Sequence, residues 1–209
     1  MRMHPVAGLV IGILAITGCA SDVASPVSSQ ASSPERSTES AIPSTGPGTS
    51  TAPSVDAVPS DQLAAFSCDL PVVADATTAL ANITDVRVGT HTDHDRVVFE
   101  FADGLPEITL DRATPPFTHD ASGMPIEVDG SSFLRLTMRG GTKQAVDGTS
   151  SYPGPTDLDP AYPMLVDLVE GGDFEAQSTW YLGLAGEACV RVIQLADDEP
   201  ARLVIDLEH

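Results

Sequence analysis

The sequence has little positive charge and few aromatic side chains. Its 209 residues include 10 Lys and Arg against 30 Asp and Glu, with Lys143 as the single lysine, and aromatic residues make up 5%. Four of the acidic and two of the basic residues precede residue 60, so residues 60–209 hold 26 acids and 8 bases, a formal charge of −18. A surface this negative excludes nucleic acid as a partner and direct adsorption to anionic lipid headgroups.

Catalytic signatures are also absent. The sequence contains no Gly-x-Ser-x-Gly elbow, no His-Glu-x-x-His pair and no glycine-rich phosphate loop, so we expect no enzymatic activity and no cofactor. The richest polar cluster is His91–Asp95, with two histidines and two aspartates. It could ligate a metal, but zinc would need further ligands from distant residues. Asp and His also favour turns for backbone reasons, and we prefer that interpretation.

The apolar run Val6–Ile16 is too short to cross a membrane. At 1.5 Å per residue it would span about 16 Å, roughly half of a bilayer core. Together with the positively charged start Met1–His4 it is typical of a signal peptide. The following Ile-Thr-Gly-Cys, residues 16–19, resembles the bacterial lipobox, in which the chain is cut before the cysteine and the thiol receives a diacylglyceryl group. The resemblance implies a signal peptide over residues 1–18 and a lipid anchor on Cys19, outside the cell membrane. The alternative is an ordinary secretory signal that happens to contain a cysteine.

Composition changes after the signal peptide. Residues 20–59 are rich in Ser, Thr, Pro and Ala and contain no aromatic residue. Such a segment cannot bury enough apolar surface to offset the entropy lost on ordering. We therefore expect a disordered linker over residues 19–59, with a coil span of about 35 Å, followed by a single domain over residues 60–209.

Two cysteines remain in the domain, Cys68 and Cys189. An even pair in an exported domain is typical of a disulfide. This bond would tie the segment that enters the domain to a strand near its end. Two buried free thiols are the alternative.

Short runs of alternating apolar and polar residues extend through the domain, separated by turn signals. They predict strands at 85–89, 96–101, 108–110, 132–139, 164–169, 174–184, 190–195 and 202–207. Gly171–Asp173 predicts a turn, and Val73–Ala81 is the one helical candidate. Many short strands indicate an all-β fold, a sandwich or a barrel.

Two of these segments repeat one pattern. Arg96–Phe101 and Arg202–Leu207 both have the order Arg, apolar, Val, apolar, acid, apolar. The arginine and the acid of each copy share one face but lie about 13 Å apart, too far to pair within a strand. If the two strands are antiparallel neighbours, cross-strand ion pairs follow, namely Arg96 with Asp206 and Glu100 with Arg202. Ligand binding by these charges is the alternative.

The order of several motifs resembles the AMIN domain, in the AMIN-like variant of Gram-positive lipoproteins. The matching pieces are VRVGTH (86–91), DRVVFEF (95–101), YPGP (152–155), GDFEAQSTWYLGL (172–184) and RLVIDL (202–207). The resemblance covers about residues 84–207. It implies a small β-sandwich that localises at the cell wall by binding peptidoglycan, without the amidase machinery that accompanies AMIN domains elsewhere. An adaptor that binds another envelope protein is the alternative.

Aromatic rings and arginines are the expected contacts for wall material, because ring faces suit sugars and guanidinium groups suit carboxylates of peptide stems. The candidates are Tyr152, Tyr162, Trp180, Tyr181, Arg135 and Arg139. Because Trp180 and Tyr181 are adjacent on a strand, we expect one in the core and the other at least partly exposed. Tyr152 is either an exposed platform or a lid on the core. The two arginines could instead balance nearby acids.

Overall fold

The computed structural model of the protein describes residues 63–209. The expected signal peptide 1–18, Cys19 and the linker 19–59 lie outside the described residues. The sheets, the hydrophobic core and the disulfide of the described residues lie within the compact unit Thr51–His209. We therefore expect residues 51–209 to fold on their own. The described residues form strands and no helix, which confirms the all-β fold class.

The first sheet has six strands in the order β1-β4-β7-β11-β10-β9, and every neighbouring pair is antiparallel. Along β7 and β11, alternate side chains enter the core, as the period of two of a strand requires; they are Leu134, Leu136 and Met138 on β7 and Trp180, Leu182 and Leu184 on β11. The strands are β1 (Val72–Ala74), β4 (Glu107–Ala113), β7 (Ser132–Arg139), β9 (Asp157–Leu158), β10 (Leu165–Phe174) and β11 (Gln177–Leu184).

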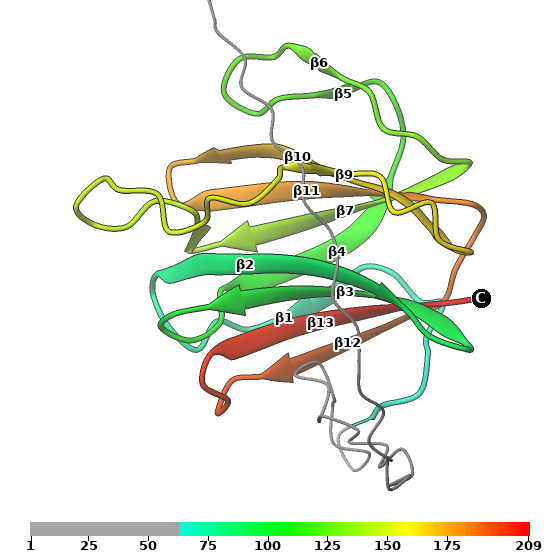
Figure 1. Cartoon of the computed structure of the whole chain (residues 1–209), viewed down its shortest axis with the longest axis horizontal. Coiled ribbons are helices and arrows are strands. Elements are labelled where there is room, and N and C mark those ends of the chain that lie inside the picture. Colours follow the sequence, from blue (N-terminus) through cyan, green and yellow to red (C-terminus); the bar gives the residue numbers. More distant parts are fainter. Residues whose placement is uncertain (1–62) are drawn as a thin grey trace, which may run out of the picture. The chain divides into compact units, whose positions relative to one another are not determined.

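The second sheet has five strands in the order β12-β13-β3-β2-β8, with only β2 and β8 parallel. The strands are β2 (Ala81–Thr90), β3 (His94–Phe101), β8 (Gly141–Thr142), β12 (Val190–Leu195) and β13 (Ala201–Glu208). In Figure 1, β10, β11 and β7 of the first sheet lie above β2, β3, β13 and β12 of the second. Side chains of both sheets form one continuous core that includes Phe99, Phe101 and Trp180. The fold is a β-sandwich.

The segment between β4 and β7 folds over the outer face of the six-stranded sheet. It forms a small hairpin of β5 (Phe117–Thr118) and β6 (Pro125–Ile126), at the top of Figure 1. The Phe117 ring packs against Tyr181, with centroids 4.6 Å apart. At Gly183 a Cβ atom would lie 1.8 Å from the carbonyl oxygen of Asp129, so only glycine permits the returning chain to cross β11 this closely.

The helix expected over Val73–Ala81 is wrong. Val72–Ala74 forms the edge strand β1, and β2 already begins at Ala81. Between them, Thr77 N donates to the carbonyl of Leu105, and Leu105 N donates to Thr77 Oγ1, at 2.9 and 2.8 Å. Pairing with β4 and the loop before it outweighs the weak helix propensity of this short Ala/Thr-rich segment.

The turn expected at Gly171–Asp173 is also wrong. β10 continues to Phe174 with a bulge between Glu170 and Gly172. The hairpin turn falls at Glu175 and Ala176, whose φ angles of 52° and 56° are those that a type I′ turn requires. Gly171 and Gly172 therefore lie in the bulge and not in the turn.

Candidate functional site

A buried ion cluster lies on the outer face of the five-stranded sheet. β13 pairs with β3 so that Asp206 stands opposite Arg96 and Arg202 opposite Glu100, the register that the repeated pattern predicts. Asp206 is fully buried, and its carboxylate accepts hydrogen bonds from Arg96 Nε and Arg191 Nη2, both at 2.6 Å. Two guanidinium groups thus share one buried carboxylate.

Hydrogen bonds determine the charge state of Asp206. Burial alone would raise its pKa, but the bonds from Arg96 and Arg191 outweigh burial and lower the pKa. His94 Nε2 lies 3.5 Å from the same carboxylate, and the Phe66 ring packs 4.3 Å from the guanidinium carbon of Arg191. Because its charges pair with one another inside the protein, the cluster has a structural role.

The two charges of the second pair also stand opposite each other across the strands, and each has a further partner. Glu100 Oε1 accepts a hydrogen bond from Arg87 Nη2 at 2.7 Å, and Arg202 donates to Asp198. These charges also pair within the domain, so they do not form a ligand site.

The His91–Asp95 cluster lies at the turn between β2 and β3. The rings of His91 and His94 stack with centroids 4.4 Å apart, and the buried Asp95 accepts hydrogen bonds from the backbone of Met164 and Leu165, at 2.7 and 2.8 Å. Within residues 63–209, no group of three or more His, Cys, Asp or Glu side chains is arranged to hold a metal ion. The Asp95 side chain fastens the hairpin to the start of β10.

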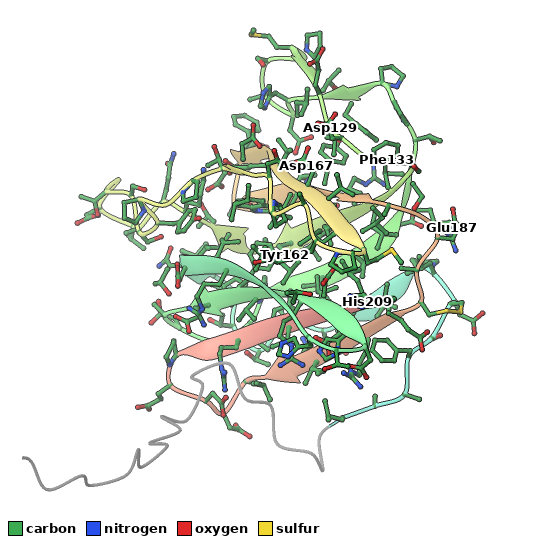
Figure 2. All side chains as sticks on the ribbon, turned by 45° about the vertical axis from the view of Figure 1, so that its right-hand side comes forward. Asp129, Phe133, Tyr162, Asp167, Glu187 and His209 are labelled. Atoms are coloured by element: carbon green, nitrogen blue, oxygen red, sulfur yellow. A yellow bond between two sulfur atoms is a disulfide. The ribbon has the colours of Figure 1, made fainter. Side chains whose placement is uncertain are left out.

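The aromatic rings that we expected to contact sugar are packed against protein. Trp180 is 0% and Tyr181 7% exposed, so the expectation that one of them is partly exposed is wrong, because the β5–β6 segment covers Tyr181. Tyr152 is a lid on the core: it is 5% exposed, its hydroxyl donates to the carbonyl of Pro155 at 2.7 Å, and burial raises its pKa to about 12. Tyr162, labelled in Figure 2, is half-buried against the core. None of these rings is a flat exposed platform.

Trp180 fluorescence tests this correction, because Trp180 is the single tryptophan of the chain. Its ring lies edge-on to Phe99 with centroids 5.4 Å apart, and its Nε1 donates to Ser178 Oγ at 3.1 Å. We expect the emission of the folded domain to resist acrylamide quenching and to stay unchanged when peptidoglycan fragments are added. Urea-unfolded protein, in which the ring is accessible, is the control. A fall in Trp180 emission intensity, or a shift of its emission maximum, on adding peptidoglycan fragments would show that Trp180 contacts them.

The outer face of the six-stranded sheet holds a pocket of about 490 Å³. Among its lining residues are Arg112, Phe117, Asp120, Arg135 and Tyr181. Burial raises the pKa of the Tyr181 phenol, and the charge of Asp120 raises it further, whereas the charge of Arg135 lowers it. The phenol therefore lies within the field of both charges. We call this the Arg135 pocket.

Arg135 differs from the other seven basic side chains of residues 63–209. Each of those seven pairs with a carboxylate, and Arg135 has no such partner. Asp111 stands opposite Arg135 across β4 and β7, but its Oδ1 accepts from Arg112 N at 2.8 Å. Arg139, on the same strand face, lies 3.9 Å from Glu107 and outside the Arg135 pocket. In a very acidic domain, Arg135 is an exposed cation without an internal counter-ion.

Sequence reasoning misses the other walls of this pocket. Arg112 lies near the end of β4 and pairs with Glu187, which Figure 2 labels, while Phe117 and Asp120 belong to the segment that folds over the sheet. The sequence of that segment is rich in Pro, Gly, Asp and Ser, and its few apolar residues give no signal of where it packs. It is brought over Tyr181 by long-range contacts.

The two remaining predicted residues, Cys68 and Cys189, are joined by a disulfide. Next to them, Ser67 and Val190 exchange two backbone hydrogen bonds, both at 2.8 Å. The segment before β1 is thus tied to the start of β12.

Two mostly antiparallel sheets packed face to face define a β-sandwich, and one outer face carries the charged Arg135 pocket. The family model of the AMIN-like domain matches residues 81–209, and the chain belongs to the AMIN-like domain family. No curated protein and no solved structure matches the chain. Membership implies a non-catalytic, extracytoplasmic module associated with the cell wall. Within residues 63–209, no helix is both long and apolar enough to span a membrane.

Proposed function

We propose that the protein is a lipoprotein, anchored through Cys19 to the outer face of the cell membrane, whose domain binds carboxylate groups of peptidoglycan peptides in the Arg135 pocket. The observation that carries the proposal is the guanidinium of Arg135, which lacks an internal carboxylate partner and lines an open pocket. Its planar fork of N–H donors matches a carboxylate. A bound carboxylate would supply the counter-ion that the domain's own acids do not.

The linker and the lipid complete this proposal. As a flexible coil, residues 19–59 would reach about 35 Å from the membrane, and a diacyl anchor would hold the chain there stably. The domain would then connect membrane and wall without catalysing a reaction.

An adaptor function is supported by one edge strand. β12 is a six-residue strand at the edge of its sheet, and among the described residues only Ser67 pairs with its outer side. Such an edge can accept a strand from another envelope protein.

Co-sedimentation of residues 51–209 with purified peptidoglycan tests the wall-binding proposal. We expect the domain to pellet, and Arg135→Ala to weaken binding roughly tenfold or more, because a hydrogen bond to a charged group contributes about 1.5–3 kcal/mol. Arg139→Ala is the matched control, since it makes the same charge change on the same strand face outside the pocket, and it should bind like the unaltered domain.

The co-sedimentation should be done with two wall preparations, one that keeps its anionic polymers and one from which they have been removed. The anionic polymers would repel this acidic domain. Failure to pellet with both preparations would exclude peptidoglycan binding and leave the adaptor function, for which crosslinking should identify a protein partner. Equal losses for Arg135→Ala and Arg139→Ala would place the binding site outside the Arg135 pocket.

A further inference from the structure

A small apolar cluster lies on the outer face of the five-stranded sheet, apart from the main core. Its members are each 1–5% exposed and are Val98, Ile193, Leu195 and Val204. By the period of two of a strand, they share a face with the Asp206 cluster and point away from the core between the sheets. Side chains on an outer sheet face become this deeply buried only when something covers them.

The strands of the described residues do not supply this cover. The six-stranded sheet packs on the inner face, and the β5–β6 hairpin lies over the other sheet, so no strand of residues 63–209 crosses this outer face. Charged side chains flank the cluster without lying over it: Val204 stands between Arg202 and Asp206 along β13, and both of these are held in ion pairs. Leu63–Ala65, where the described chain begins, are themselves exposed.

The course of the chain at its first described residues indicates where the cover comes from. Ser67 pairs antiparallel with Val190, so toward lower residue numbers the chain runs along β12 in the direction of the apolar cluster. The Phe66 ring lies over Arg191 on this same face. Three strand spacings, roughly 14 Å, separate β12 from β2. Residues 51–62, which the compact unit Thr51–His209 includes, can span up to about 40 Å when extended, so they are long enough to cross the face.

The composition of residues 51–62 matches the chemistry of this face. The segment has two valines, Val55 and Val58, and two acids, Asp56 and Asp61. Three arginines lie around the apolar cluster, and each has an interaction in addition to the ion pairs described above; they are Arg87, Arg96 and Arg202. The valines can pack on the cluster while carboxylates and backbone carbonyls accept hydrogen bonds from the guanidinium groups.

We propose that residues 51–62 pack across the outer face of the five-stranded sheet, with Val55 and Val58 covering the apolar cluster. The domain then begins at residue 51 instead of residue 60, and the linker leaves it on this face. The Arg135 pocket lies on the outer face of the other sheet, so the linker does not cover it. This consequence for the pocket rests on the function proposed above, whereas the packing of residues 51–62 does not.

Methyl NMR of the unlipidated chain, residues 20–209, tests the packing. We expect nuclear Overhauser contacts from the methyl groups of Val55 or Val58 to those of the apolar cluster. We also expect a soluble gadolinium chelate to relax the Ile193 methyl signal as weakly as that of Ile205, which lies in the main core, because both methyl groups are covered.

Val55→Asp combined with Val58→Asp should raise the relaxation of the Ile193 methyl signal severalfold and leave that of Ile205 unchanged. Two carboxylates cannot be buried against apolar side chains without partners, so the segment would leave the face. Val23→Asp combined with Val27→Asp is the matched control, since it makes the same change in the linker, and it should leave both signals unchanged.

The proposal is overturned if the chelate relaxes Ile193 strongly in the unaltered chain, if Val55 and Val58 show no contact with the cluster, or if the two double variants behave alike. Protection that is lost on dilution, with a dimer in analytical ultracentrifugation, would assign the cover to a second copy of the chain and also overturn it. The Overhauser contacts need no variant, so they decide even if the altered chain unfolds. None of these results depends on whether the domain binds peptidoglycan.

Discussion

Asp206→Ala should lower the free energy of unfolding by about 3–5 kcal/mol, because removing one partner of a buried ion pair leaves an uncompensated buried charge. Removing the Asp206 carboxylate would leave two buried positive charges without this partner. Arg96 and Arg191 both donate to this carboxylate, and their side chains are only 7% and 10% exposed. Neither guanidinium can deprotonate to escape the penalty. Urea unfolding of residues 51–209 measures the loss as a shift of the midpoint at unchanged slope.

Asp198→Ala is the matched control for this prediction. Its partner Arg202 belongs to the second copy of the repeated pattern, but the Asp198 side chain is 40% exposed. A surface pair of this kind contributes about 0–1 kcal/mol. If both variants lose the same small amount, the buried cluster is no more stabilising than a surface pair, and the structural role assigned to Asp206 is wrong.

The register of this cluster is predictable from the sequence because both strands encode it. An arginine and an acid four residues apart on one strand face can pair only with their complements on a neighbouring strand. Antiparallel pairing of two copies brings Arg96 opposite Asp206, as the structure shows. Arg191, which reaches the same carboxylate from β12, has no counterpart in the pattern and could not be assigned.

The candidate site is less predictable because it depends on which side chains remain unpaired. Arg135 and Arg139 are equivalent in the sequence, both at outward positions of one strand. Their difference arises from neighbours on β4, since Glu107 lies near Arg139 while Asp111 accepts a hydrogen bond from the Arg112 backbone. Such contacts follow from strand register, which local patterns do not specify without a known partner.

The failures at Tyr181 and at the β10–β11 turn also have physical causes. Alternation correctly places Trp180 and Tyr181 on opposite faces of the strand, but the β5–β6 segment covers Tyr181 on the outer face through contacts distant in sequence. At the turn, Glu175 and Ala176 adopt positive φ, for which Gly, Asn and Asp are the usual signals. Gly171 and Gly172 led to the wrong turn prediction, because they lie in a bulge through which the strand continues.

Replacing both Cys68 and Cys189 by serine should destabilise the domain by about 4–5 kcal/mol in the chain-entropy model. The bond closes a loop with a sequence separation of 121, most of the described chain. Without it, the segment before β1 keeps the Ser67–Val190 hydrogen bonds and the Phe66–Arg191 contact, both confined to one end of β12. Urea unfolding measures the loss, and the unaltered domain under reducing conditions should match the double variant.

The slope of the same unfolding curves distinguishes two origins of this effect. If the disulfide acts by restricting the unfolded chain, its removal exposes more surface on unfolding and the slope rises. If it acts in the folded state, the slope stays constant and amide exchange at Ser67 and Val190 accelerates instead. The double variant itself should not respond to reductant. A loss below about 1 kcal/mol would contradict the chain-entropy account and would mean that the sandwich core and β1 hold the segment without the bond.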